Sequence, residues 1–209
     1  MNPHILRLRS MREQTEAVGE TMKYEAERFT ALANRDAVRV VSSFNLFQTP
    51  VAIADRMARL ANPQDGERWL EPSAGLGRLY QAIRNRSQAI VTLVENAPQC
   101  ASELYRQTEQ DDCAQLIQED FLECTVDRIG LFHGVLMNPP FKMGRDIKHI
   151  RNAERFVLPG GRIVSLCYAG PKQRAAFENR NGWTWEMLPS GSFKTEGTGA
   201  DVALIWKQV

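Results

Sequence analysis

Four consecutive residues, Asn138-Pro139-Pro140-Phe141, combine the groups in this sequence that are best suited to chemistry. They follow the apolar run 134–137, which places them where a buried strand ends. The two prolines fix φ and remove two backbone donors, so this corner of the chain offers carbonyl acceptors and few donors. An Asn amide, rigid carbonyls and an aromatic ring together suit an exocyclic amino group on a flat ring.

The chemistry that this corner favours is activation of an aromatic amine. The amino nitrogen of adenine or guanine is a poor nucleophile because its lone pair is delocalised into the ring. If the Asn138 side-chain oxygen and the Pro139 carbonyl each accept one N–H, the lone pair localises on nitrogen. Phe141 would stack on the base and hold it in line with an electrophile. The alternative is that these residues form only a stiff turn, since Asn-Pro and Pro-Pro mark turns generally.

Acidic residues close three earlier strand segments, at Glu71, Glu95 and Asp120. The carboxylate of Glu95 can accept both hydroxyls of a ribose, and Asp120 offers an acceptor for an adenine amino group beside the ring of Phe121. For any one acid, the simpler explanation is that strand ends are exposed to solvent and often polar. Three acids, each at its own strand end and followed by the Asn-Pro-Pro-Phe corner at a fourth, indicate one shared ligand site.

A Gly-x-Gly turn, Gly75-Leu76-Gly77, joins the strand that ends at Glu71 to the following helix. Glycines let a ligand approach backbone N–H groups closely. The third glycine of the dinucleotide fingerprint is replaced by Tyr80, so the turn by itself could be only a tight turn. The charge of Glu71 disfavours a pyrophosphate and suits a cationic ligand. A sulfonium nucleoside with an amino-acid end meets these demands, because it carries a positive charge, a ribose, an adenine and a transferable methyl group.

These residues need a scaffold in which strands alternate with helices. β-branched and apolar runs predict strands at 67–71, 89–95, 115–118, 131–137, 162–167, 183–188 and 200–206. A composition rich in Arg, Glu, Ala and Met with almost no Gly or Pro predicts a helix at 5–41, and further helices are expected from 51, from 79, at 97–107 and at 147–156. Thr49 is the expected N-cap of the second helix, with Pro50 at its first position. The alternation predicts an α/β fold with a mainly parallel sheet, helices on both faces, and ligands at the carboxyl ends of the strands.

The composition is that of a soluble globular protein with one α/β domain and an appendage. The chain has 209 residues, of which 43% are hydrophobic and 24% charged. No apolar run approaches membrane-spanning length and no leader opens the chain, so we expect no membrane partner and a cytoplasmic location. The cysteines are scattered and the histidines lack ligand spacing, so we expect reduced thiols and no metal.

Basic residues gather after the Asn-Pro-Pro-Phe corner, although the net charge of the chain is only +1. The first group is Lys142, Arg145, Lys148, His149, Arg151 and Arg155, and the second is Lys172, Arg174 and Arg180. Either group could simply be the solvated face of a helix. Their position beside the expected site favours contact with phosphates. The candidate nucleic-acid-binding residues are Lys142, Arg145, Lys148, Arg174 and Lys194.

The order of these motifs resembles that of S-adenosylmethionine-dependent class I amino-methyltransferases, especially DNA adenine-N6 methyltransferases. The resemblance covers residues 44 to 206 and runs through Phe47-Gln48-Thr49-Pro50, 71–77, Glu95, Asp120-Phe121 and the Asn-Pro-Pro-Phe corner. Only the last of these is specific, because most of the superfamily shares the Gly-rich loop. The resemblance implies a Rossmann-like, seven-stranded sheet whose last strand is antiparallel. It also implies a methyltransferase domain at 44–209, preceded by a helical extension at 1–43.

The resemblance further implies S-adenosylmethionine as cofactor, with Gln48-Thr49-Pro50 at its methionine end and Glu95 on its ribose. The catalytic residues would be Asn138, Pro139, Pro140 and Phe141. The cofactor-binding residues would be Gln48, Thr49, Pro50, Glu71, Ser73, Ala74, Gly75, Gly77, Glu95, Asn96, Asp120, Phe121 and Asn138. The 193–201 segment is similar to the final hairpin of relatives from phages and mobile elements.

The leading hypothesis is therefore methyl transfer to N6 of adenine in DNA, with the base flipped out of the duplex. A second hypothesis keeps the site and changes the acceptor to guanine N2 or adenine N6 in RNA, or to a glutamine amide in a protein. A third is a non-catalytic nucleic-acid-binding protein built on a retained cofactor fold. The sequence leaves the oligomeric state open.

Overall fold

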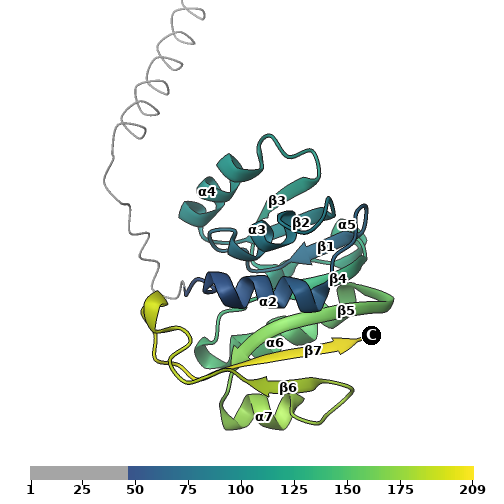
Figure 1. Cartoon of the computed structure of the whole chain (residues 1–209). Coiled ribbons are helices and arrows are strands. Elements are labelled where there is room, and N and C mark those ends of the chain that lie inside the picture. The colour runs from purple at the N-terminus through teal and green to yellow at the C-terminus, as the bar shows by residue number, and fades with distance from the viewer. Residues whose placement is uncertain (1–46) are drawn as a thin grey trace, which may run out of the picture. The chain divides into compact units, whose positions relative to one another are not determined.

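The structure is a computed structural model and describes residues 47–209. The helix expected at 5–41, and with it the expected extension at 1–43, lies outside these residues. Seven strands form one sheet in the order β3-β2-β1-β4-β5-β7-β6 (Figure 1). Their bounds are β1 (Arg68–Glu71), β2 (Ile90–Glu95), β3 (Ala114–Gln118), β4 (Phe132–Met137), β5 (Val157–Tyr168), β6 (Thr184–Met187) and β7 (Val202–Gln208).

The sheet has the mixed topology that the sequence analysis predicts. Strands β1 to β5 pair in parallel, whereas β7 is antiparallel to both of its neighbours, β5 and β6. The strand order reverses between β1 and β4, because the chain first moves outward through β2 and β3 and then returns. A ligand site is expected at the carboxyl ends of the strands around such a switch point.

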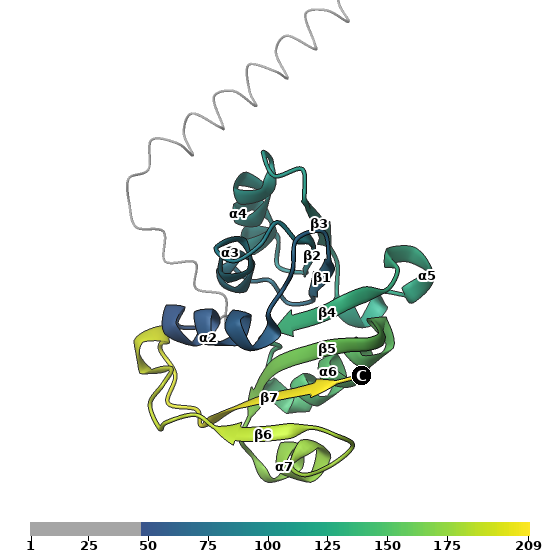
Figure 2. The ribbon, with the colours of Figure 1, turned by 45° about the vertical axis from the view of Figure 1, so that its right-hand side comes forward.

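Helices cover both faces of the sheet. The α-helices are α2 (Val51–Ala61), α3 (Arg78–Arg84), α4 (Pro98–Thr108), α5 (Val126–Ile129), α6 (Arg145–Ala153) and α7 (Pro171–Phe177). Side chains of α2, α3 and α4 belong to one hydrophobic cluster, and those of α5, α6 and α7 belong to a second. The turned view shows α2 and α6 on opposite sides of β4 and β5 (Figure 2). Four short 3-10 helices lie between these elements in residues 47–209: η1 (Phe121–Glu123), η2 (Lys142–Gly144), η3 (Glu154–Phe156) and η4 (Lys194–Glu196).

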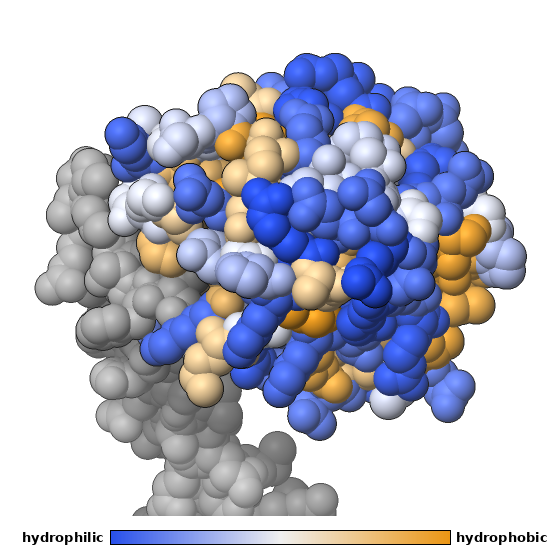
Figure 3. Space-filling view, turned by 90° about the horizontal axis from the view of Figure 1, so that it is seen from below, coloured by the Kyte–Doolittle hydropathy of each residue, from blue (hydrophilic) through white to orange (hydrophobic). Residues whose placement is uncertain are grey.

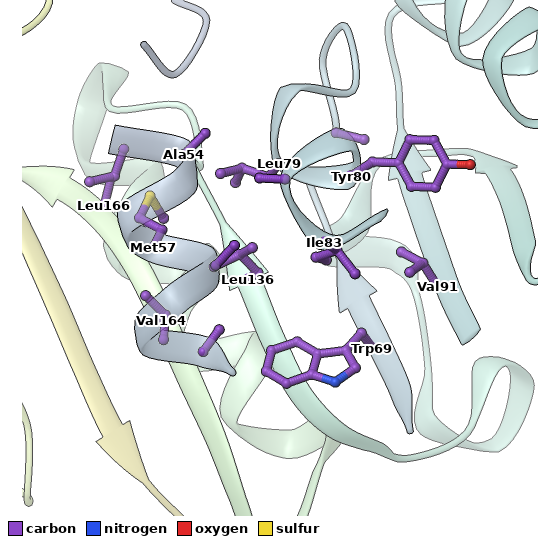
Figure 4. Packing of buried hydrophobic residues seen from close by; sticks show 14 of the residues in the cluster. Ala54, Met57, Trp69, Leu79, Tyr80, Ile83, Val91, Leu136, Val164 and Leu166 are labelled. Atoms are coloured by element: carbon purple, nitrogen blue, oxygen red, sulfur yellow. The ribbon is translucent and has the colours of Figure 1, made fainter. Parts of the chain in front are cut away.

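The first hydrophobic cluster fixes the helices that carry the cofactor motifs. Met57 of α2 packs toward Leu136 and Val164 of the sheet, as Figure 4 shows. The indole of Trp69 in β1 lies over Gly134 in β4, so close that a Cβ there would stand 2.4 Å from Trp69 Cη2. Gly134 is therefore required by packing, because a side chain there would collide with Trp69. The two residues are partners in the parallel pairing of β1 and β4.

The start of α2 differs from the prediction. The helix begins at Val51 with Pro50 as its N-cap residue, and no side chain caps it. Thr49 was predicted to be the cap, and this was wrong because its hydroxyl accepts a hydrogen bond from Asn138 instead, at 3.1 Å. Local capping rules assign the Thr49 hydroxyl oxygen to the helix, but in the structure it bonds to a residue 89 positions away.

The carboxylate of Asp146 fixes the first turn of α6 to the end of β5. Asp146 is fully buried and accepts hydrogen bonds from the backbone N–H of Tyr168 and from Gln173 Nε2, each at 3.0 Å. Burial raises the pKa of Asp146, although these donors and the N–H of Ile147 oppose that shift. The loop after the Asn-Pro-Pro-Phe corner is therefore fixed at its C-terminal end by the hydrogen bonds of Asp146.

The surface seen from the end that carries α7 and β6 is mainly hydrophilic, with hydrophobic side chains in separate groups (Figure 3). Among residues 47–209, no helix combines the length and apolar character that crossing a bilayer requires.

Candidate functional site

A cavity of about 390 Å³ opens at the carboxyl ends of β1, β2 and β4. All five sequence motifs reach it, although they are spread over residues 47–141. The predicted site residues that line it are Gln48, Thr49, Glu71, Ser73, Ala74, Gly75, Glu95, Asn96, Asp120, Phe121, Asn138, Pro139, Pro140, Phe141, Lys142 and Arg145. Pro50, Gly77, Lys148, Arg174 and Lys194, also predicted, do not line it.

The carboxylate of Glu95 at the end of β2 organises the glycine turn. Its Oε2 accepts the N–H of Gly75 at 2.7 Å, and its Oε1 accepts the N–H of Ala97, also at 2.7 Å. Each carboxylate oxygen has a second lone pair, so Glu95 can still accept hydroxyl donors from a ligand. The side chain is buried, and these two backbone bonds hold it in one orientation at the cavity wall.

Gly77 contributes to the site through its backbone conformation, without lining the cavity itself. Its φ of +80° is left-handed, and it is the N-cap residue of α3. A Cβ there would stand 2.8 Å from Gln107 Oε1 and 2.9 Å from Leu104 Cδ2, both on α4. Glycine is favoured here because it adopts the left-handed conformation without strain and leaves room for the Gln107 and Leu104 side chains of α4.

Glu71, at the end of β1, is a buried acid facing the cavity. Burial raises the pKa of Glu71 well above its usual range; the N–H of Tyr80 opposes this shift and the nearby Glu95 adds to it. Its Oε2 is buried and has no hydrogen-bond partner among the described residues. A cationic group placed beside Glu71 would favour its ionised form and so oppose the effect of burial on its pKa.

Asp120 is closed on one side by Arg145. Its Oδ1 accepts the N–H of Leu122 at 3.0 Å, and its Oδ2 accepts from Arg145 Nη2 at 2.7 Å. Partial burial alone would raise the pKa of Asp120, but the N–H of Leu122 and the guanidinium of Arg145 outweigh burial and lower it. Arg145, predicted to bind nucleic acid, therefore joins the loop after Phe141 to the expected adenine site.

The amide of Asn138 has a fixed orientation. Its Nδ2 donates to the carbonyl of Phe47 at 3.0 Å and to Thr49 Oγ1 at 3.1 Å. Both amide hydrogens are thereby used, and among residues 47–209 no donor is paired with Oδ1. The side chain thus presents an acceptor at the cavity. Pro139 is buried, and Phe141 is half-buried and packs against the first hydrophobic cluster.

His149 was grouped with the basic residues expected to contact phosphates, and the structure contradicts this. Its side chain is buried, with Nδ1 3.3 Å from Ser73 Oγ and its ring beside that of Phe121. Burial, reinforced by the charge of Arg145 and opposed by Asp120, lowers the pKa of His149 to about 4. The ring is therefore neutral at physiological pH and forms part of the wall under the cavity.

The remaining basic candidates lie in different surroundings. Lys142 is exposed at the cavity mouth, and Lys148 is exposed on α6 outside the lining. Arg174 pairs with Glu178 on α7, its Nη1 donating to Oε1 at 2.9 Å, and its guanidinium lies over the ring of Trp185. Lys194 is on η4. The structure thus brings Lys142 and Arg145 to the site and not the other three.

Several lining residues were missed by the sequence analysis, among them Arg78, Cys100 and Met143. Arg78 donates to Gln48 Oε1 at 2.9 Å, which joins the start of α3 to the segment before α2. Cys100 forms part of the wall from α4, and burial, with the charge of Glu95, raises the pKa of its thiol to about 11. Met143 lines the mouth. Arg78 directly follows the glycine turn, which was a usable signal; Cys100 and Met143 carried none. No group of three or more metal-ligating side chains occurs within residues 47–209.

Comparison with solved structures identifies the fold. A putative RNA methyltransferase, PH1948 from Pyrococcus horikoshii, superposes with a TM-score of 0.62 at 19% identity over 86% of this chain and 96% of that one. A dimethyladenosine transferase from Plasmodium falciparum gives a TM-score of 0.60 at 14% identity, over 78% and 62%. Precorrin-6y C5,15-methyltransferase from Geobacter metallireducens gives 0.59 at 15% identity, over 77% and 89%.

The chain therefore has the Rossmann-like fold of class I methyltransferases, with seven strands and helices on both faces, as predicted. No family model matches the sequence, and no curated protein matches it either. At these identities the likeness establishes the fold alone. Because the similar structures include proteins named for RNA and for a precorrin, the fold does not select an acceptor, and the acceptor has to be argued from the cavity.

Proposed function

We propose that this chain is an S-adenosylmethionine-dependent methyltransferase that modifies the exocyclic amino group of a nucleobase, with N6 of adenine in DNA as the leading acceptor. The observation that carries the proposal is the orientation of Asn138. Its two amide hydrogens are occupied by Phe47 and Thr49, so its oxygen is left to accept a hydrogen bond at the cavity. A planar NH₂ group is the complementary donor.

The residues around the cavity fit the cofactor. A cationic group would favour the ionised form of the buried Glu71 carboxyl, whose Oε2 has no hydrogen-bond partner among the described residues. Glu95 retains acceptor capacity for ribose hydroxyls, while Asp120 and Phe121 offer an acceptor and a ring for adenine. When bound, S-adenosylmethionine would supply a methyl group on a sulfonium, an electrophile that needs no metal.

The chain's own residues would prepare the amine. Asn138 Oδ1 and the Pro139 carbonyl would each accept one amino hydrogen, which localises the nitrogen lone pair. Phe141 would stack on the base and fix its direction of approach. The activated nitrogen would then take the methyl carbon, and the sulfur would leave with the electron pair of the broken sulfur–carbon bond. The extra proton on nitrogen then passes to water, so no general base is required.

Two observations favour different polymers. The order of the motifs supports DNA through its resemblance to adenine-N6 enzymes, whereas the corner itself fits either polymer, since Tyr is frequent at the position of Phe141 in the DNA enzymes and Asn-Pro-Pro-Phe also occurs in guanine-N2 RNA methyltransferases. The solved structures named as a putative RNA methyltransferase and a dimethyladenosine transferase support RNA as the second candidate. In either polymer the amino group faces a base partner in a duplex, so the base has to leave the stack to enter the cavity, at a cost of a few kcal/mol.

The test is methyl transfer from tritiated S-adenosylmethionine by the full chain. Unmethylated plasmid DNA, total RNA and total protein are offered in parallel, and labelled nucleosides are separated afterwards. We expect label in N6-methyladenine of DNA. Label confined to RNA would replace DNA by the second candidate, and label confined to protein would remove the nucleobase assignment altogether.

A measurement of binding separates an inactive relative from an enzyme that lacks its substrate. S-Adenosylmethionine and its demethylated product are each added to the protein, and the melting temperature is recorded. A ligand that binds only the folded state raises that temperature. A shift without transfer to any polymer would support a non-catalytic protein, and no shift with either ligand would contradict the proposed function.

A further inference from the structure

Met143 stands apart from every other large hydrophobic residue in the part of the chain that the structure describes. Its side chain is 92% exposed, whereas Tyr105, the next, is 62% exposed. Complete burial of a methionine side chain is worth about 1.5–3 kcal/mol, so this position forgoes that stabilisation in the free protein. Within residues 47–209 the fold does not use Met143 for packing.

The backbone holds Met143 in a conformation that side chains rarely adopt. Its φ of +57° and ψ of 25° are left-handed, and Gly144 beside it has a φ of +70°. A left-handed conformation at a residue other than glycine costs about 1–3 kcal/mol and tends to occur at functional sites. Two successive left-handed residues turn the chain sharply, so that Met143 occupies the tip of the loop between Phe141 and Arg145.

The loop tip lies at the mouth of the cavity and beside positive charge. Met143 lines the mouth together with Phe141, and the exposed ammonium of Lys142 is its neighbour. Met143 is two positions after Phe141 in the chain, so their Cα atoms lie about 7 Å apart at most. One side chain is half-buried at the cavity and the other points into solvent, so they can serve two different positions on one ligand.

The chemistry of this arrangement fits a base stack flanked by phosphates. Methionine is unbranched and polarizable, and apolar side chains of this kind can be inserted between base steps. A base that leaves a duplex creates an apolar gap between its two former neighbours. Lys142 supplies the attraction for the phosphate backbone that brings the loop to that gap.

We propose that Met143 is a wedge that enters the duplex beside the target nucleotide and fills the space vacated as the base turns toward Phe141. This inference rests on the proposed function and adds a positioning residue to it. The wedge stabilises the flipped arrangement and takes no part in methyl transfer. Its contribution is therefore confined to substrates whose target base is paired and stacked.

Methyl transfer to duplex and to single-stranded forms of one polymer tests the wedge. We compare wild type with Met143→Ala on unmethylated plasmid DNA, either intact or heat-denatured; if RNA is the acceptor, folded and denatured RNA replace them. Loss of the wedge leaves part of the flipping cost uncompensated, so we expect about a tenfold fall in kcat/KM on duplex. On denatured DNA we expect less than about a twofold change, because no stack has to be opened.

A second readout follows the opened duplex directly. Permanganate oxidises unstacked thymines, so cofactor-dependent reactive thymines should appear in duplex DNA with wild-type protein and decrease with Met143→Ala. The conservative Met143→Leu should restore both transfer and reactivity. Met187→Ala, which removes the exposed methionine of β6 outside the cavity, is the matched control and should behave as wild type.

The outcomes separate the wedge from the proposed function. If wild type methylates duplex and Met143→Ala equals it, the wedge is wrong and the function stands. An equal fall on duplex and denatured DNA would also overturn the wedge, since it would mean that Met143 only supports the loop. Met143→Gly, which relieves the left-handed strain and should melt no lower than wild type, removes misfolding as an explanation. No transfer by wild type to any polymer would overturn both proposals.

Discussion

The two walls of the cavity satisfy their polar groups differently. In the strand-end wall, formed by residues 71–77, Glu95 and Asp120, the carboxylates of Glu95 and Asp120 are tied to backbone N–H groups and to a guanidinium, and Glu71 alone keeps a buried oxygen without a partner among the described residues. The loop wall, formed by residues 138–145, leaves Asn138 Oδ1 without a paired donor among the described residues and presents Met143 and Lys142 to solvent.

This difference matches the two ligands that the proposed function assigns to the walls. A small cofactor that is always the same can be held by groups locked in advance, which lowers the cost of ordering them on binding. A polymer brings its own donors, apolar surface and charge. The wall that binds it therefore needs acceptors, apolar side chains and cations that are not already paired within the protein. Changes on the strand-end wall should therefore act through cofactor binding, and changes on the loop wall through turnover or polymer binding.

Asn138→Ala should give the largest effect and test the loop wall most severely. Loss of the acceptor should reduce kcat by about 100-fold or more, the range found when one preorganised group at a reacting centre is removed. The affinity for S-adenosylmethionine, measured by calorimetry, should change far less. Near-normal turnover by this variant would contradict the assignment of Asn138.

Gly77→Ala tests the strand-end wall, with Gly66→Ala as its matched control. Both glycines have left-handed φ, +80° and +76°, so both variants lose about 1–2 kcal/mol to backbone strain. Only the Gly77 variant also collides with Gln107 and Leu104, since nothing lies within 4 Å of a Cβ at Gly66. Gly77→Ala should therefore melt lower and bind cofactor more weakly. Equal behaviour of the two variants would show that the contact with α4 is unimportant.

Glu71→Gln should stabilise the protein in a pH-dependent way. The folded-state pKa of Glu71 lies above its unfolded value of about 4.3, so folding favours the protonated acid. That stabilisation is present below pH 4.3 and is lost as the pH rises through the folded pKa. The neutral glutamine avoids this loss, so its melting temperature should exceed that of wild type more at pH 8 than at pH 5. Affinity for the cationic cofactor should fall at the same time.

The exposed Glu123 provides the control for this titration. Glu123→Gln makes the same chemical change at an exposed position, and its melting temperature is compared with that of Glu71→Gln at both pH values. A gain for Glu71→Gln that is the same at both pH values would indicate a packing effect in place of a buried ionisation.

Lys142→Ala should give the smallest effect, and it distinguishes free from paired cations on the loop wall. Removal of one phosphate contact reduces the slope of log affinity against log salt by about 1. Arg145→Ala should change the slope less, because Arg145 is already paired with Asp120. That pair is 40% and 32% exposed, so its loss should cost no more than about 1 kcal/mol of stability. A larger slope change for Arg145 than for Lys142 would reverse these roles.

The sequence predicted the fold well where the local signal and the tertiary environment agree. The β-branched run at 90–95 is buried except at Ile90, the strand before Asn138 is buried except at His133, and both form strands as expected. The 162–167 prediction was too short, because β5 starts at Val157 and continues through Pro159 and two glycines that local rules assign to a turn.

The candidate site was predictable as a set of residues and not as a set of contacts. The motifs do meet at one cavity, because parallel strands bring their carboxyl ends to one edge. The hydrogen bond between Asn138 and Thr49 spans 89 positions and has no local signature. His149 was misplaced because its charged sequence neighbours concealed the buried helical face that it shares with Ile150 and Ala153.

The buried carboxylate of Asp146 has a consequence for engineering. It anchors the far end of the loop, and Phe141, which packs against the first hydrophobic cluster, anchors the near end, so the four residues 142–145 form a cassette between two fixed points. Doubling the length of a flexible loop costs only about 0.6 kcal/mol in closure entropy. Longer or shorter cassettes could therefore be exchanged here to alter acceptor preference, while the cofactor half of the protein stays untouched.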